Sequence, residues 1–267
     1  MSRRRGAGVI SFTAGAMIAV VVAGCGTQTT AGCAAPDISQ LLPLTKTAKS
    51  LLPDTSQLST LLRLPMQSTP GMGPFVISGR SWINLEHTSQ PQVSDCEIVA
   101  SIDKRLIDIP AESVAIQRWE KDQTADPIDK SNTAEYIVNM YVVEFENDAD
   151  AAEWFDKSIS QWKRCDGRNV TRPSLSGQSE YSDDITDVQH PSADEISAVL
   201  MSTARGTAPP PPSEWSKPSQ VGRALTHVSK FVIDATVKNN MLTPPSPPAS
   251  AKQALEVAQL AKAKATK

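Results

Sequence analysis

Residues 135–165, EYIVNMYVVEFENDADAAEWFDKSISQWKRC, form the stretch of sequence that decides the fold. The first eleven are rich in β-branched and aromatic residues, which predicts a well-buried strand. Residues 146–148 interrupt the run, and Asn147 or Asp148 can cap a following helix. That helix has one apolar face, at spacings of three and four residues: Ala152, Phe155, Ile159 and Trp162. Cys165 lies close to the next position of the face, so the helix ends by presenting a cysteine to the core.

The first 25 residues carry an export signal. Three arginines (residues 3–5) precede an apolar stretch from Val9 to Ala23, which is shorter than the roughly 20 residues of a spanning helix. The stretch closes on Val22-Ala23-Gly24-Cys25, which resembles the bacterial lipobox. The pattern predicts a lipoprotein signal peptide over residues 1–24 and a palmitate-type lipid anchor on Cys25, at the extracytoplasmic face of the cell membrane. The alternative is an ordinary secretory signal with Cys25 unmodified.

The charge of the mature chain limits its partners. The whole chain carries a net charge of −3, which becomes −6 once the three arginines of the signal are removed. An acidic protein outside the membrane is a poor ligand for nucleic acid. We therefore expect no nucleic-acid partner.

The cysteines predict one disulfide bond. Export permits disulfides, and with Cys25 lipidated, Cys96 and Cys165 remain in the folded part of the chain. Their bond would close a loop of about 69 residues, which is worth roughly 4 kcal/mol in the chain-entropy description. Pairs that use Cys33, in the tether, are the alternative; otherwise Cys33 is a leftover thiol.

The order of elements predicts an α+β fold, an antiparallel sheet packed against helices in a single extracytoplasmic domain with a possible cleft. Further strands are expected over 114–119, 185–189 and 195–204, a hairpin over 222–237, and helices over 55–64 and 251–265. The expected parts are a flexible tether at 25–36, the domain at 37–242, a Pro-rich linker at 243–250 and a C-terminal helix at 251–267.

Motifs for catalysis are not evident. The three histidines are scattered and no Cys-x-x-Cys occurs, so no metal or cofactor is expected. Asp183 and Asp184 could act as acid and base, but adjacent carboxylates in a loop are more often solvated. Among the tryptophans, Trp215 is a candidate for a ligand site. Arg223 and Asp234, on the two arms of the expected hairpin, are either a cross-strand ion pair or polar groups of a ligand cleft.

Several residues resemble one family. Trp154-Phe155, with Trp162 and Cys165 at the end of the helix, is similar to the helix of the PknH-like extracellular sensor domain of actinobacterial, mainly mycobacterial, proteins. Gly222-Arg-Ala-Leu225 and Phe231-Val-Ile-Asp234 resemble the hairpin of that family, and Cys96 matches its early cysteine. The resemblance covers roughly residues 55–265.

The resemblance implies an extracytoplasmic α+β sensor domain with a ligand cleft, here on a lipoprotein. The family carries a second disulfide at positions near Val221 and near Val237 or Lys238, and this chain has no cysteine at either place. We expect a lipid-anchored binding module, not an enzyme, for a small-molecule, lipid or glycan ligand at the cell envelope. A structural or assembly factor that contacts other envelope proteins through the Pro-rich loops is the alternative.

Overall fold

The centre of the fold is an antiparallel sheet of nine strands. The computed structural model describes residues 47–78, 95–101, 109–122, 136–173, 179–206, 218–239 and 249–267. The strands follow the order β1-β3-β4-β9-β8-β7-β6-β5, with β2 also paired to β3. The strands are β1 (Met66–Ser68), β2 (Phe75–Ser78), β3 (Ala111–Lys121), β4 (Tyr136–Phe145), β5 (Asn169–Pro173), β6 (Ser179–Ser192), β7 (Glu195–Gly206), β8 (Ser219–Val228) and β9 (Phe231–Asn239). The α+β fold predicted from the sequence is confirmed.

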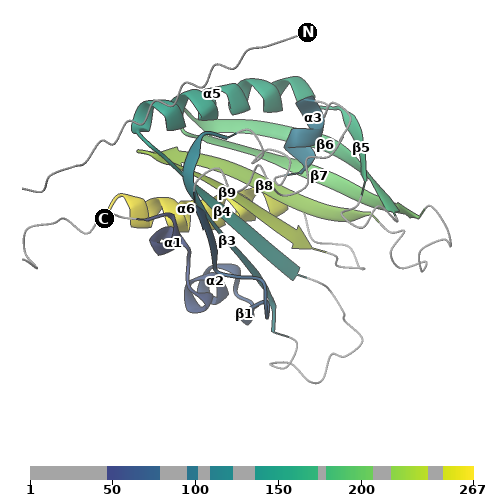
Figure 1. Ribbon diagram of the computed structural model, residues 1–267. Helices are drawn as coiled ribbons and strands as arrows, with labels where there is room; N and C mark the ends of the chain where they lie inside the picture. The colour runs from purple at the N-terminus through teal and green to yellow at the C-terminus, as the bar shows by residue number, and fades with distance from the viewer. Residues whose placement is uncertain are drawn as a thin grey trace, which may run out of the picture. The chain divides into compact units, whose positions relative to one another are not determined.

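Helices cover both faces of the sheet. They are α1 (Ala48–Leu51), α2 (Thr55–Leu62), α3 (Asp95–Ala100), α5 (Asp148–Cys165) and α6 (Ala249–Ala265). Met140 and Val142 of β4 belong to the core under α1, α2 and α6, whereas Val143 and Phe145 belong to the core under α3 and α5. Figure 1 shows α5 and α3 on one side of the strands and α6 with α1 and α2 on the other. Because both faces are covered, residues 136–145 are apolar almost throughout.

The predicted strand–helix unit is present as β4 and α5. Asn147 caps α5, since its Oδ1 accepts a hydrogen bond from the Asp150 N–H at 3.0 Å. The buried apolar positions of the helix are Ala151, Phe155, Ile159, Trp162 and Cys165. The face therefore begins at Ala151, not at Ala152 as expected. Trp154, beside this face, packs with its ring centroid 5.8 Å from that of Phe145 at the end of β4.

The C-terminal helix α6 packs on the sheet through small residues. Ala254, Val257, Ala258 and Ala261 are fully buried against the core of the α1–α2 face. At the end of the helix, Lys264 donates to the Leu52 carbonyl at 2.6 Å. The helix expected at 251–265 is thus part of the folded domain. No helix in the described part of the chain is both long enough and apolar enough to span a membrane.

The expected hairpin of residues 222–237 is formed by β8 and β9. Its turn, Ser229-Lys230, is not a sequence that favours two-residue turns, and Ser229 takes a positive φ of 50°. The Ser229 hydroxyl donates to Asp148 at the start of α5, at 3.0 Å, so a tertiary contact holds the turn. Val221 lies directly opposite Lys238 in this ladder. The two places where the resemblance implies a second disulfide are therefore neighbours across the strands.

Several elements differ from the sequence expectations, among them β6, β5 and α3. β6 is 14 residues long, whereas the sequence predicted a short strand at 185–189. Asp183 and Asp184, expected in a solvated loop, lie within this strand: Asp183 is 1% exposed and pairs with Arg172 of β5 at 2.5 Å. The edge strand β5 and the six-residue helix α3 were not predicted. Polar residues on one or both sides of these elements hide their periodicity.

Candidate functional site

The two polar candidates of the hairpin form a buried ion pair. Arg223 Nε donates to Asp234 Oδ1 at 3.0 Å, and Nη2 donates to Oδ2 at 2.6 Å. The two residues are 1% and 2% exposed. The arrangement is bidentate, the strong geometry for an arginine and a carboxylate. Two further predicted site residues, Trp215 and Cys25, lie outside the described part of the chain, as do Cys33 and the tether.

Arg223 also holds helix α3 against the sheet. Its Nη1 donates to the carbonyl of Ile98 at 3.2 Å and to that of Val99. These carbonyls belong to the last turn of α3, where helical carbonyls lack partners of their own, so Arg223 acts as a C-terminal cap. The guanidinium carbon also lies 5.3 Å from the centroid of the Trp162 ring of α5. One side chain thus connects β8, α3 and α5.

The predicted disulfide bond joins the same two helices. Cys96 and Cys165 are bonded, with 5.4 Å between their Cα atoms and a sequence separation of 69 residues. Cys96 is in the first turn of α3, and Cys165 is the last residue of α5. Helix α3 is consequently fixed at its start by a covalent bond and at its end by Arg223. A helix of only six residues has little stability of its own, so these anchors determine its position.

A hollow of about 520 Å³ opens beside this bond, and we name it the disulfide groove. It is lined by Asp95, Cys96, Arg164, Cys165, Arg168, Asn169, Val170 and Thr171. Arg164 pairs with Asp95 at 3.4 Å, and both side chains are more than half exposed. Arg168 is exposed and forms no side-chain hydrogen bond or ion pair with a described residue. The groove thus combines two guanidinium groups with one carboxylate.

The outer edge of β5 forms one side of the groove. The Arg168 carbonyl accepts a hydrogen bond from the Ile185 N–H of β6 at 2.9 Å. Backbone groups alternate along a strand, so those of Asn169 and Thr171 point away from β6, toward the free edge. The Asn169 side chain donates to Asp184 at 2.6 Å, whereas the Thr171 side chain is exposed. Backbone N–H donors are thus available beside the arginines.

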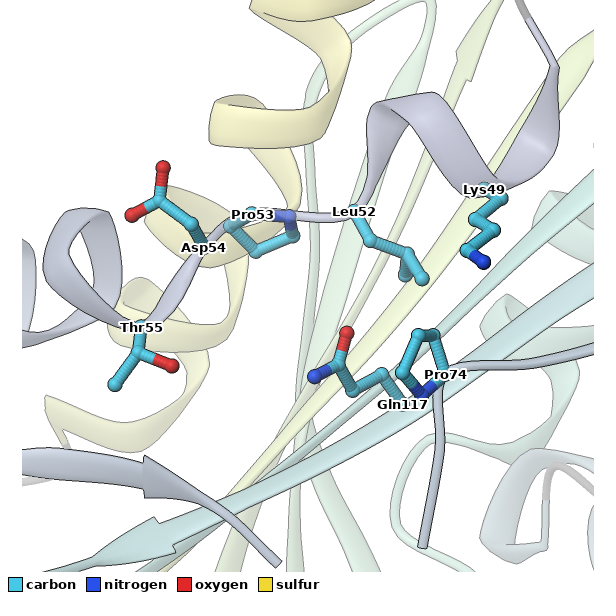
Figure 2. A pocket seen from close by; sticks show the side chains of 7 residues that line it. All are labelled: Lys49, Leu52, Pro53, Asp54, Thr55, Pro74 and Gln117. Carbon is cyan, nitrogen blue, oxygen red and sulfur yellow. The ribbon is translucent and has the colours of Figure 1, made fainter.

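A second hollow of about 300 Å³ lies under the two N-terminal helices, and we name it the α1–α2 pocket. It is lined by Lys49, Leu52, Pro53, Asp54, Thr55, Pro74 and Gln117. Figure 2 shows Gln117 and Pro74 on one side, facing Leu52 and Pro53, with the Asp54 carboxylate directed away from the space between them. Asp54 caps α2, and the Gln57 backbone N–H and the Ser56 hydroxyl lower the pKa of its carboxyl group. The single cation of this lining, Lys49, is thus matched by one carboxylate.

Glu144 positions the helix above this pocket. Its carboxylate accepts from the Ala48 N–H at 3.2 Å and from the Ser113 hydroxyl at 2.9 Å, and it pairs with Lys230 at 2.8 Å. Burial by itself would raise the pKa of Glu144, but the bonds from Lys230, Ser113 and Ala48 outweigh burial, and the pKa is lowered. Glu144 is therefore a charged anchor for α1.

Comparison with known proteins identifies the family of this chain. The family described as PknH-like extracellular domain matches residues 45–264, which is most of the sequence. The chain belongs to this family. The PknH-like domain also matches the crystal structure of the extracellular domain of PknH from Mycobacterium tuberculosis, with a TM-score of 0.56 and 18% identity. That match covers 82% of this chain and 94% of the other, and it shows the same fold.

Two further comparisons add no argument about the PknH-like domain. An uncharacterised protein from Mycobacterium smegmatis is 10% identical, with a TM-score of 0.34 over 80% of this chain and 97% of the other. No curated protein matches the chain at a significant level.

The two hollows described above indicate what chemistry the described part of the PknH-like domain can perform. Among the residues with described positions, no group of three or more His, Cys, Asp or Glu side chains lies together as a metal site would require. Arg223 and Asp234, candidates for a ligand cleft, line neither hollow; they support a wall of the disulfide groove. The sequence signalled the disulfide but not the groove, because β5 and α3 have no strong pattern.

Proposed function

We propose that this protein is a membrane-anchored lipoprotein whose sensor-like extracytoplasmic domain binds a ligand in the disulfide groove. The observation that carries the proposal is the groove itself: about 520 Å³, with walls held by a disulfide and a buried arginine. Sites for small molecules commonly measure about 300–1,000 Å³. Family membership supports a sensor-like role. The proposal gives the domain a binding role and no catalytic step, cofactor or nucleic-acid partner.

The lipid anchor is tested by a single substitution. Cys25→Ala removes the thiol that would carry the lipid, and we expect the protein to leave the membrane fraction. Cys33→Ala is the matched control, because it removes a nearby cysteine of the tether and leaves Cys25 in place. Equal membrane retention of the Cys25→Ala variant and the wild type would contradict the anchor.

The ligand is tested by mass spectrometry of the full chain, purified from its native membrane in mild detergent. We expect a small molecule, lipid or glycan to accompany the protein. Arg168→Trp places a large ring at the lining of the disulfide groove and should abolish recovery of the ligand. Thr55→Trp does the same to the α1–α2 pocket and should leave recovery unchanged. The reverse pattern would assign the ligand to the other hollow, and absence of any ligand would count against sensing.

An assembly role is the second candidate, and one surface feature favours it. Met72, Phe75 and Val76 are 45%, 48% and 45% exposed, close together in sequence at the short edge strand β2. Exposed apolar clusters of this kind occur at protein contacts. If the domain acts by assembly, Phe75→Ser should reduce crosslinking to an envelope protein in cells while ligand recovery is unaffected. Unchanged crosslinking would remove the support for this role.

A further inference from the structure

We infer that the disulfide groove binds a phosphate group, held between the guanidinium groups of Arg164 and Arg168. The inference rests on the proposed function and gives the chemical class of its ligand. The phosphate could belong to a lipid headgroup or to a water-soluble ester, since both present the same anionic oxygens to the groove.

Both arginines can take a ligand at little cost. Arg168 has no side-chain partner among the described residues, and the partner of Arg164, Asp95, is 69% exposed at a distance of 3.4 Å. A solvent-exposed ion pair of this kind is worth about 1 kcal/mol or less. Exchange of Asp95 for a phosphate oxygen therefore costs little. The planar guanidinium group can bind phosphate with two parallel hydrogen bonds.

Neutral donors complete the site. The outer edge of β5, which pairs with no further described strand, brings the outward backbone N–H groups of Asn169 and Thr171 to the same hollow. A tetrahedral phosphate can use donors from several directions at once, whereas a carboxylate presents two oxygens in one plane. The donors come from the last turn of α5, from the short connection that follows it and from β5. This spread favours phosphate over carboxylate.

Two of the nearby negative groups are neutralised or shielded. Asp183 lies opposite Val170 in the β5–β6 ladder, is buried and pairs with Arg172 at 2.5 Å. The C-terminus of α5 carries a partial negative charge, but the Cys165 carbonyl accepts from the Arg168 N–H at 3.0 Å, and Arg164 lies in this last turn. Asp95 is the remaining acid in the lining, and it would compete with the ligand for Arg164.

The walls are fixed before a ligand arrives. The disulfide and the Arg223 contacts set α3 relative to α5, so binding requires little ordering of the backbone. The α1–α2 pocket offers a phosphate less, because it has one lysine and one carboxylate in its lining.

The test measures phosphate affinity by equilibrium dialysis of the full chain in a nonionic detergent. The probes are inorganic phosphate, glycerol 3-phosphate, dihexanoylphosphatidylglycerol and, for comparison, acetate. We expect Arg168→Gln and Arg164→Gln each to raise the Kd for the phosphate probes about tenfold, the loss of one charge-assisted bond. Asp95→Asn should lower the Kd, because it removes the competitor for Arg164. Arg63→Gln changes an exposed arginine at the C-cap of α2, outside the groove. This variant is the matched control and should leave the Kd unchanged.

The relative affinities of the probes and variants distinguish the possible ligands. Tighter binding of the short-chain phospholipid than of glycerol 3-phosphate identifies a lipid headgroup, and equal binding identifies a water-soluble ester; both support the inference. Acetate that binds as tightly as phosphate, or a Kd that responds to Arg63→Gln as much as to Arg168→Gln, overturns it. An uncharged ligand recovered from the native protein, with retention unaffected by Arg168→Gln, overturns the phosphate inference and leaves the proposed function intact. Recovery of no ligand, with no probe bound, overturns both.

Discussion

The two hollows differ in what holds their walls. The disulfide groove depends on α3, which a covalent bond and a buried arginine fix in place. The α1–α2 pocket depends on α1, a helix of four residues that the Glu144 carboxylate and the Lys264 ammonium group hold through its backbone. Both helices are too short to be stable alone. Each short helix therefore needs its own anchor. The anchor of α3 is sensitive to reduction of the disulfide, whereas the anchor of α1 is sensitive to pH through the Glu144 carboxylate.

Removal of the disulfide should have the largest effect. Cys96→Ser with Cys165→Ser should lower the free energy of unfolding by about 4 kcal/mol, because the bond closes a loop of 69 residues. Urea denaturation measures the loss, and hydrogen exchange should show faster exchange in α3 than in α1. Equal acceleration in both helices would contradict the separate anchoring of the two hollows.

Loss of the buried Asp234 carboxylate should have the second largest effect on the free energy of unfolding. Asp234→Asn leaves the Arg223 guanidinium buried without a counter-charge, and we expect a loss of about 3 kcal/mol in the free energy of unfolding. The double variant Arg223→Met with Asp234→Leu removes both charges and should recover part of this loss. A double variant less stable than Asp234→Asn would show that the Arg223 bonds to α3 outweigh the cost of the unpaired charge.

The anchor of α1 should show a pH dependence. The pKa of Glu144 is lowered below its ordinary value of 4.5 in the folded protein, so its stabilisation is complete above that value and disappears as the pH falls through the lowered pKa. Glu144→Gln should therefore cost about 1–2 kcal/mol at pH 7, and less at pH 3. Urea denaturation of both proteins at the two pH values gives the difference. A constant difference across this range would mean that the charge of Glu144 is not what anchors α1.

The smallest effect is expected at the rim of the groove. Arg164→Gln breaks an ion pair whose side chains are 61% and 69% exposed, and the free energy of unfolding should change by less than about 1 kcal/mol. Thermal denaturation should show a nearly unchanged midpoint. A large shift would mean that Arg164 stabilises the fold, and it would then be unsuitable for the binding test.

The sequence predicted the elements with strong apolar patterns. β4, α5, the β8–β9 hairpin and the docked face of α6 each carry several buried apolar side chains in a regular spacing. The Cys96–Cys165 bond was predictable from export and from the family resemblance. Helix α3 was not, because Val99 is the one fully buried side chain in its six residues. The groove depends on α3 and β5, and neither its shape nor its two arginines could be assigned from spacing alone.

The contacts of α1 have a mechanical consequence. The chain enters the described domain at Thr47, so a pull from that side reaches α1 before any strand. The load would act on two polar contacts, Glu144 to the Ala48 N–H and Lys264 to the Leu52 carbonyl, and on the buried Leu51 side chain. The ladder of the sheet would not yet be strained. Helix α1 would therefore be the first element to extend under tension. The disulfide groove would keep its shape, because a covalent bond fixes α3 to α5.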